Sequence, residues 1–130
     1  MKIKSVRAFP INIEPNPTTE ARVEKDPEGG YFVSPMARYT TEKPGRSWAA
    51  NWERVACVVT AEDGTWGLGL SAASGPVSSI INDHFSELLI GLNPMSTEKL
   101  WDMMRRASAA HGTAGLNSYA ISAVDNAIWD

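Results

Sequence analysis

The sequence has one cysteine, two histidines and no long hydrophobic run, and each shortage excludes a class of protein. Cys57 cannot form an internal disulfide or a thiolate metal cage, and it stands in an apolar run where a buried, reduced thiol is expected. No stretch approaches the roughly twenty apolar residues of a membrane-spanning helix, and the N-terminus carries no export signal. We therefore expect a cytoplasmic protein with no membrane partner.

Positive charge is also scarce. Twelve Lys and Arg stand against fifteen Asp and Glu, which gives a net charge of −3. Such a chain has no basic field to hold a nucleic-acid backbone, so we expect no nucleic-acid partner. The remaining composition, 43% hydrophobic and 21% charged over 130 residues, is typical of one folded domain.

The first third of the chain divides into a strand and a long loop. Residues 2–13 are rich in β-branched and aromatic side chains and predict a strand, and Pro10 favours an edge position or a bulge because it has no N–H to donate. Residues 14–51 hold five of the eight prolines and show no period of 2 or 3.6. At least the second half of this loop is expected to pack against another surface, since a solvated linker has no use for large aromatic rings. These rings are Tyr31, Phe32, Tyr39, Trp48 and Trp52.

A β-hairpin is predicted over residues 54–70, with Asp63-Gly64 as a two-residue turn. In that register paired residue numbers sum to 127. Cys57, Val59 and Ala61 then share the core face with Leu70, Leu68 and Trp66. Gly67 and Gly69 fall on the other face, where their simplest role is to let a helix approach the sheet.

Three helices are expected after the hairpin, over about 76–90, 97–109 and 118–130. Pro76 would open the first and Gly91 would close it. Ser96 or Thr97 would start the second, and Asn117 or Ser118 would cap the third. The predicted inward-facing residues are Val77, Ile80, Ile81, Phe85, Leu88, Leu89, Leu100, Trp101, Met104, Ala107, Ile121, Val124, Ala127 and Ile128.

No local motif supplies catalytic chemistry. Gly69-Leu70-Ser71-Ala72-Ala73 is a degenerate version of a nucleophile elbow, but only His84 and His111 could serve as its base. Gly67-Leu68-Gly69 lacks the third glycine of a dinucleotide fingerprint. Asp125 and Asp130 are not spaced as metal ligands, so no metal site is predicted within the chain.

The long loop does carry candidates for anion binding. Arg38 lies beside Tyr39, and Arg46 lies two residues before Trp48. A guanidinium next to an aromatic ring can bind a carboxylate through two hydrogen bonds. From composition alone, a solvated surface position remains the commoner role for both arginines.

The chain stops at Asp130 in the middle of a helical pattern, without a glycine or a basic residue to end it. A carboxylate at a helix C-terminus opposes the helix dipole. We therefore expect the 130 residues to be one domain of a longer polypeptide.

Three stretches together resemble the N-terminal capping domain of the enolase superfamily, in the branch of mandelate racemase and muconate lactonizing enzyme. They are the opening strand from Ile3 to Phe9, the hairpin from Val58 to Gly69, and the helix from Ala120 to Asp130. The sequence from Ser34 to Tyr39, followed by Arg46, is similar to the rhamnonate dehydratase group of acid-sugar dehydratases.

This resemblance implies an α+β fold, a three-stranded antiparallel sheet followed by a helical bundle, which normally caps a (β/α)8 barrel that is absent here. Members of the branch bind Mg2+ through barrel carboxylates and abstract the proton α to a substrate carboxylate, and dehydratases then expel the β-hydroxyl. The cap contributes specificity and excludes water through two loops, here 14–51 and 71–75. The catalytic residues would lie in the barrel, so the fragment alone is expected to be inactive.

The resemblance also implies site residues. Arg46 matches a position where the rhamnonate dehydratase group has a substrate-contacting arginine, and Trp48 and Tyr31 are weaker candidates for contact with the sugar acid. The segment from Pro27 to Phe32 departs from that group because it has no histidine. A racemase or cycloisomerase of the same branch stays open as an alternative, as does a stand-alone protein-binding module. When full length, such an enzyme is expected to be a homo-oligomer.

Overall fold

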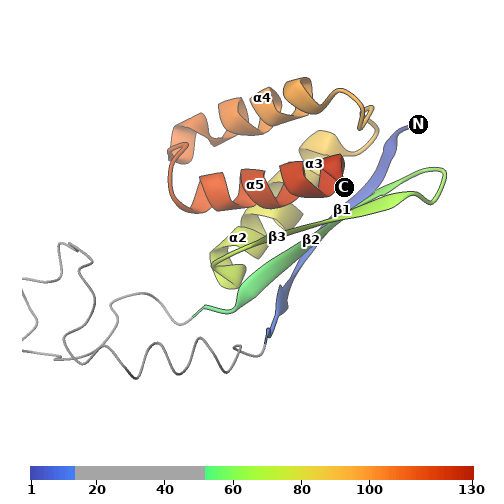
Figure 1. The fold of residues 1–130 in the computed structure, drawn as a ribbon. Helices are drawn as coiled ribbons and strands as arrows, with labels where there is room; N and C mark the ends of the chain where they lie inside the picture. The colour runs from blue at the N-terminus through green and yellow to red at the C-terminus, as the bar shows by residue number, and fades with distance from the viewer. Residues whose placement is uncertain (14–51) are drawn as a thin grey trace, which may run out of the picture. The chain divides into compact units, whose positions relative to one another are not determined.

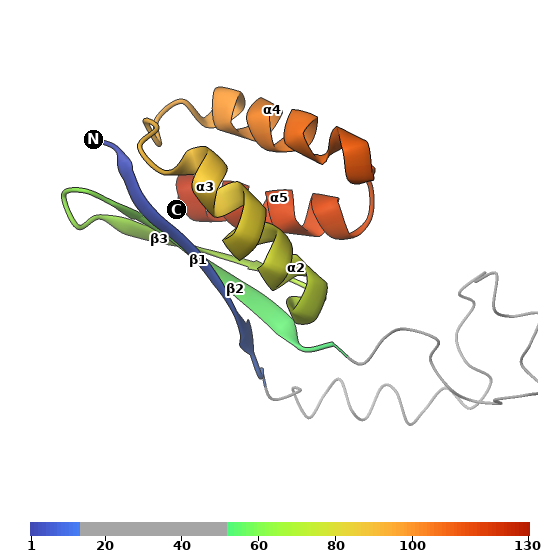
Figure 2. The ribbon, with the colours of Figure 1, turned by 180° about the vertical axis from the view of Figure 1, so that it is seen from behind.

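A computed structural model describes residues 1–13 and 52–130 of the chain (Figure 1). These residues form one compact unit with two layers, a three-stranded antiparallel sheet in the order β1-β2-β3 and a set of helices packed on one of its faces (Figure 2). The predicted α+β architecture is confirmed. The strands are β1 (Ile3–Ile11), β2 (Arg54–Ala61) and β3 (Trp66–Ser71). The helices are α2 (Ser74–Ile80), η2 (Ile81–Phe85), α3 (Ser86–Leu89), α4 (Thr97–Ala107), η3 (Ser108–His111) and α5 (Leu116–Trp129).

Strand β1 is an edge strand, as Pro10 predicts. One side chain of the helical layer and the backbone that follows α3 cover part of that edge. The Asn82 side chain accepts a hydrogen bond from the Ala8 N–H and donates one to the Ala8 carbonyl, both at 2.8 Å. Near the start of the strand, Ile3 donates to the Leu92 carbonyl and accepts from the Gly91 N–H. These bonds satisfy backbone groups that an open edge would offer to another chain.

The predicted hairpin is present, but the predicted register is wrong by one residue, because paired residue numbers sum to 126. The loop has three residues rather than two, because Ala61 and Thr65 form the last backbone pair, with the Ala61 N–H donating to the Thr65 carbonyl at 2.8 Å. Gly64 takes a φ of +91°, the left-handed conformation that such a loop needs at its last position. Cys57 therefore pairs with Gly69 and Val59 with Gly67, whereas Trp66, Leu68 and Leu70 lie on the opposite, exposed face.

The register places both glycines of β3 beneath α5, so their predicted role in close helix approach is confirmed. A Cβ at Gly69 would lie 1.9 Å from the Ala123 carbonyl oxygen, and one at Gly67 would lie 2.1 Å from that of Ala127. No side chain other than hydrogen fits between this strand and this helix. The helix thus rests directly on the backbone of the strand.

The three helical runs begin and end within two residues of the predicted positions. The first run starts at Ser74 rather than Pro76, which is its third residue, a place where proline is tolerated because its N–H would be unpaired anyway. Its middle, η2, is a π-helical turn that carries Asn82 toward β1. The second helix ends at Ala107 and continues as the 3-10 turn η3.

The predicted capping of α5 is wrong. The helix begins at Leu116 after Gly115, and neither Asn117 nor Ser118 accepts from its free N–H groups. Instead, the Asn117 amide donates to the carbonyls of His111 and Gly112, and the Ser118 hydroxyl donates to the Thr113 carbonyl. Both side chains therefore fix the α4–α5 connection rather than the start of α5.

The core lies between the sheet and the helices, and most of the predicted inward positions are buried there. Trp101 is an exception, because 43% of its surface is exposed. No helix in the described part of the chain is long and apolar enough to cross a membrane. The largest fully buried side chains are Phe85, Ile3, Ile81, Leu89, Leu100, Met104, Val55, Val77, Val124 and Cys57.

Candidate functional site

The strand ends that flank residues 14–51 and the turn from β3 into α2 lie at the same end of the sheet (Figure 1). Residues 14–51 connect the end of β1 to the start of β2. The turn from β3 into α2 lies beside the start of β2, because Val55 pairs with Ser71. This end of the domain is therefore the candidate functional site.

The turn from β3 into α2 is short and contains an unusual backbone conformation. Ala73 has φ 61° and ψ 55°, the one non-glycine residue with positive φ among those that the structure describes. This left-handed conformation brings its Cβ close to its own carbonyl and costs about 1 kcal/mol for a residue other than glycine. Ala73 is nonetheless buried, and its carbonyl accepts the Val77 N–H at 3.1 Å, so the surrounding structure holds the strained turn in place.

A hydrogen bond joins this turn to the residues that lead into β2. The Ser74 N–H donates to the Glu53 carbonyl at 3.0 Å. Trp52 lies next to Gly75, since a Cβ added at Gly75 would be 3.9 Å from the indole ring. The last described residues before β2 and the start of α2 are thus joined by a backbone hydrogen bond and by contact between Trp52 and Gly75.

Among residues 1–13 and 52–130, no nucleophile stands beside a base at this end of the sheet. Ser71 pairs with Val55 at the end of β3, while His84 and His111 are exposed on η2 and η3. Burial raises the pKa of the Cys57 thiol to about 12, so Cys57 is protonated at neutral pH and unsuited to nucleophilic attack. The hydrolase interpretation of the elbow-like motif therefore has no support from the described residues.

No metal centre is formed by the described residues either. Within residues 1–13 and 52–130, no three His, Cys, Asp or Glu side chains lie close enough together to hold an ion. The donor set for Mg2+ therefore does not fit in this part of the chain.

The site residues predicted from sequence lie outside the described residues. Arg46, Trp48 and Tyr31 all fall within 14–51, as does Arg38. Two residues that the sequence did not identify as special are instead visible at the site, Ala73 with its left-handed backbone and Glu53 with its bonded carbonyl. Trp52, the last ring of the aromatic set, lies near Gly75 but is 50% exposed, and the other four rings lie outside the described residues.

Comparison with known proteins identifies the family. Residues 48–130 match the family described as mandelate racemase / muconate lactonizing enzyme, N-terminal domain. The L-rhamnonate dehydratase of Saccharopolyspora erythraea is 33% identical over an alignment of 132 residues that covers 100% of this chain and 34% of that protein. A relative from Caldivirga maquilingensis is 37% identical over 103 residues, 78% of this chain and 26% of its own length.

Solved structures agree with this relationship. The crystal structure of rhamnonate dehydratase from Gibberella zeae complexed with Mg matches 98% of this chain and 32% of that one, with 27% identity and a TM-score of 0.74. The 3,6-anhydro-D-galactonate cycloisomerase from Zobellia galactanivorans has the same fold, with 23% identity, a TM-score of 0.66, and coverage of 100% of this chain and 28% of its own. The chain thus spans about a third or less of the length of these relatives. On this evidence the chain belongs to the mandelate racemase and muconate lactonizing enzyme family of the enolase superfamily, as its N-terminal capping domain.

Proposed function

We propose that this domain is the specificity cap of a longer, Mg2+-dependent acid-sugar dehydratase of the rhamnonate dehydratase type. The observation that carries the proposal is 33% identity to an L-rhamnonate dehydratase across the whole chain. The match to the Mg-complexed dehydratase of Gibberella zeae supports it. The cycloisomerase is less similar in sequence and shares only the fold.

In this proposal the metal and the reacting bonds belong to the barrel domain. When bound there, Mg2+ stabilises the negative charge that develops on the substrate carboxylate as its α-proton is removed. Among the described residues of the cap, no cluster of His, Cys, Asp or Glu side chains could hold this metal. The contribution of the described residues is to connect residues 14–51 to β1 and β2 and to hold the strained turn at Ala73 beside the start of β2.

Residues 14–51 are proposed to contact the sugar acid. Arg46 supplies a positive charge for an anionic substrate within a chain of net charge −3, and Trp48 and Tyr31 supply apolar surface against the sugar ring. Such a loop excludes water when it closes over a barrel mouth. The loss of the Arg46 side chain should therefore reduce stabilisation of the transition state and leave the fold intact.

The direct test is an assay of the full-length protein on a panel of sugar acids with Mg2+, with product detection specific for 2-keto-3-deoxy acids. Conversion of L-rhamnonate or a related six-carbon acid to such a product is the expected result. An epimerised or cyclised product from the same panel would identify a racemase or cycloisomerase instead. The chain of residues 1–130, assayed in parallel, should give no product, and turnover by it alone would reject the proposal.

A further inference from the structure

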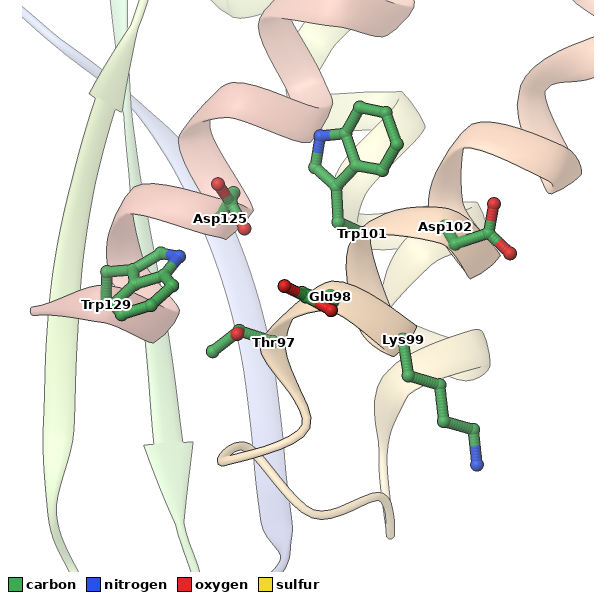
Figure 3. Close-up of a pocket in the computed structure, with 7 residues that line it drawn as sticks. All are labelled: Thr97, Glu98, Lys99, Trp101, Asp102, Asp125 and Trp129. Atoms are coloured by element: carbon green, nitrogen blue, oxygen red, sulfur yellow. The ribbon is translucent and has the colours of Figure 1, made fainter.

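A groove separates α4 from α5 at a distance from the loop end of the sheet. Its volume is about 570 Å3, and it is lined from α4 by Glu98 and Trp101 and from α5 by Asp125 and Trp129 (Figure 3). The two indoles come from different helices and border the same space. Trp101 is 43% exposed and Trp129 is 70% exposed, which is unusual for the largest apolar side chains.

Three carboxylates line this groove, and two of them, Glu98 and Asp125, take part in no ion pair with the described residues, whereas the third, Asp102, is paired. The single ion pair among the described residues joins Arg106 to Asp102 at 2.6 Å, so Asp125 and Glu98 take part in none there. Lys99 borders the groove but extends from α4 away from Asp125 (Figure 3). Asp125 is half-buried, and desolvation raises its pKa, as expected for a carboxylate without a compensating charge.

Two indole faces beside unpaired carboxylates match the chemistry of a guanidinium or ammonium group. Aromatic faces attract cations through their quadrupole, and a carboxylate adds a charge-assisted hydrogen bond. Trp101 already receives one such contact on this surface, since the Arg105 guanidinium carbon lies 5.8 Å from its ring centroid. The groove is thus complementary to a lysine or arginine side chain that arrives with apolar neighbours.

We propose that this groove, lined by Trp101, Trp129 and Asp125, receives a lysine or arginine side chain from the polypeptide that follows Asp130 in the full-length protein. This proposal rests on the proposed function, because both require a protein longer than the 130 residues given. Trp129 is the last residue of α5, so residues after Asp130 start at one end of the groove. Relatives extend over about three times the length of this chain, so in a protein of that length enough polypeptide follows to fold back onto α4.

Thiol labelling of paired variants tests the proposal. Glu98→Cys places a thiol in the groove, and Glu87→Cys places one at an exposed position in the first turn of α3, away from it. Each is labelled with a maleimide in the full-length protein and in the chain of residues 1–130, and the rates are read by peptide mass spectrometry. Cys57, which is buried, reports that each preparation is folded.

In the full-length protein the thiol at position 98 should react about tenfold or more slowly than the thiol at position 87, equivalent to about 1.4 kcal/mol of protection. In the chain of residues 1–130 the two rates should be similar. Adding Asp125→Asn to the full-length protein should restore fast labelling at position 98, because the cation loses its partner. Because relief of protection depends on the charge at residue 125, the result separates binding of a cation from simple coverage.

Three results would overturn the proposal. Equal labelling at both positions in the full-length protein means that nothing covers the groove. Protection that increases with protein concentration means that a second copy occupies it. Protection that survives Asp125→Asn means that the occupant is not held as a cation. Failure of the dehydratase assay with position 98 still protected would reject the proposed function alone, whereas activity with position 98 unprotected would reject only this inference.

Discussion

The substitution Gly69→Ala tests the contact on which the packing of the domain depends. The new Cβ would lie 1.9 Å from the Ala123 carbonyl oxygen and 2.8 Å from the Ala127 nitrogen. Both obstacles are helix backbone, which cannot rotate away as a side chain does. Helix α5 would have to retreat by roughly 1.5 Å to restore a van der Waals separation. Its buried face, which includes Ala120, Ala123 and Val124, would lose close packing against the sheet.

The expected cost of Gly69→Ala is about 3 kcal/mol, the upper part of the range for overpacked cores. Urea unfolding of the chain, followed by far-ultraviolet circular dichroism, measures it, and thermal unfolding should show a midpoint lower by about 10 °C. Gly64→Ala is the matched control, because no atom lies within 4 Å of its added Cβ and only its positive φ is strained. That control should cost about 1 kcal/mol. If the two variants were equally stable, direct contact between β3 and α5 would not be what positions the helix.

Four further predictions follow from other contacts and charges. Asn82→Ala should destabilise the chain by about 1–2 kcal/mol because both Ala8 backbone groups lose their partner. Asn82→Asp should be at least as destabilising at neutral pH, since a carboxylate cannot donate to the Ala8 carbonyl. Urea unfolding midpoints measure both effects, and an unchanged midpoint for Asn82→Ala would refute the edge contact. Cys57, whose pKa is about 12 in the fold, should resist iodoacetamide at pH 8 in buffer and react in urea, so rapid labelling of the native chain would contradict its burial. Asp125 has a raised pKa in the folded chain, so ionisation of its carboxyl group favours the unfolded state, and its contribution to stability should rise as pH falls through the folded pKa. Asp125→Asn in the chain of residues 1–130 should remove that part of the pH dependence. The free energy of unfolding of both proteins, measured between pH 3 and pH 7, would show or exclude this difference. Arg46→Ala in the full-length enzyme should lower kcat/KM for the sugar acid by the equivalent of about 2 kcal/mol with an unchanged melting temperature, and unchanged kinetics would remove Arg46 from the site.

Secondary structure could be predicted where the apolar period was strong. The stripe from Val77 to Leu89 predicted the first helical run because its buried positions recur every three or four residues. The π-helical turn within it could not be predicted, since the same stripe continues through the turn with no change in period. That turn places Asn82 against β1, a contact between residues 74 positions apart in sequence.

The hairpin shows how one uncounted residue changes the interpretation of a whole strand. Asp63-Gly64 was correctly recognised as a turn sequence, but Glu62 also belongs to the loop, and side chains in a strand alternate between faces. The error moved Trp66, Leu68 and Leu70 from the exposed face to the core. The information that corrects it is not local, because the glycines identify the inner face only once α5 is known to lie on it.

The candidate site was less predictable than the fold because its visible parts are backbone features. A left-handed alanine has no sequence signature, since glycine or asparagine is the usual residue in that conformation. The carbonyl of Glu53 bonds to Ser74 whatever side chain residue 53 carries. The family resemblance, by contrast, pointed to Arg46, Trp48 and Tyr31 through residue identity.

The strained turn and the close packing of β3 with α5 belong to one mechanical unit. Ser71 ends the strand whose glycines rest on α5, and Ala73, two residues later, is the N-cap residue of α2. The contact between β3 and α5 holds the end of β3 next to the turn, and the Glu53–Ser74 hydrogen bond joins the turn to the described residues that precede β2. A cap that selects substrates through this segment needs such a rigid base, because a shift of about 1 Å in a positioning group is enough to cost a hundredfold in rate.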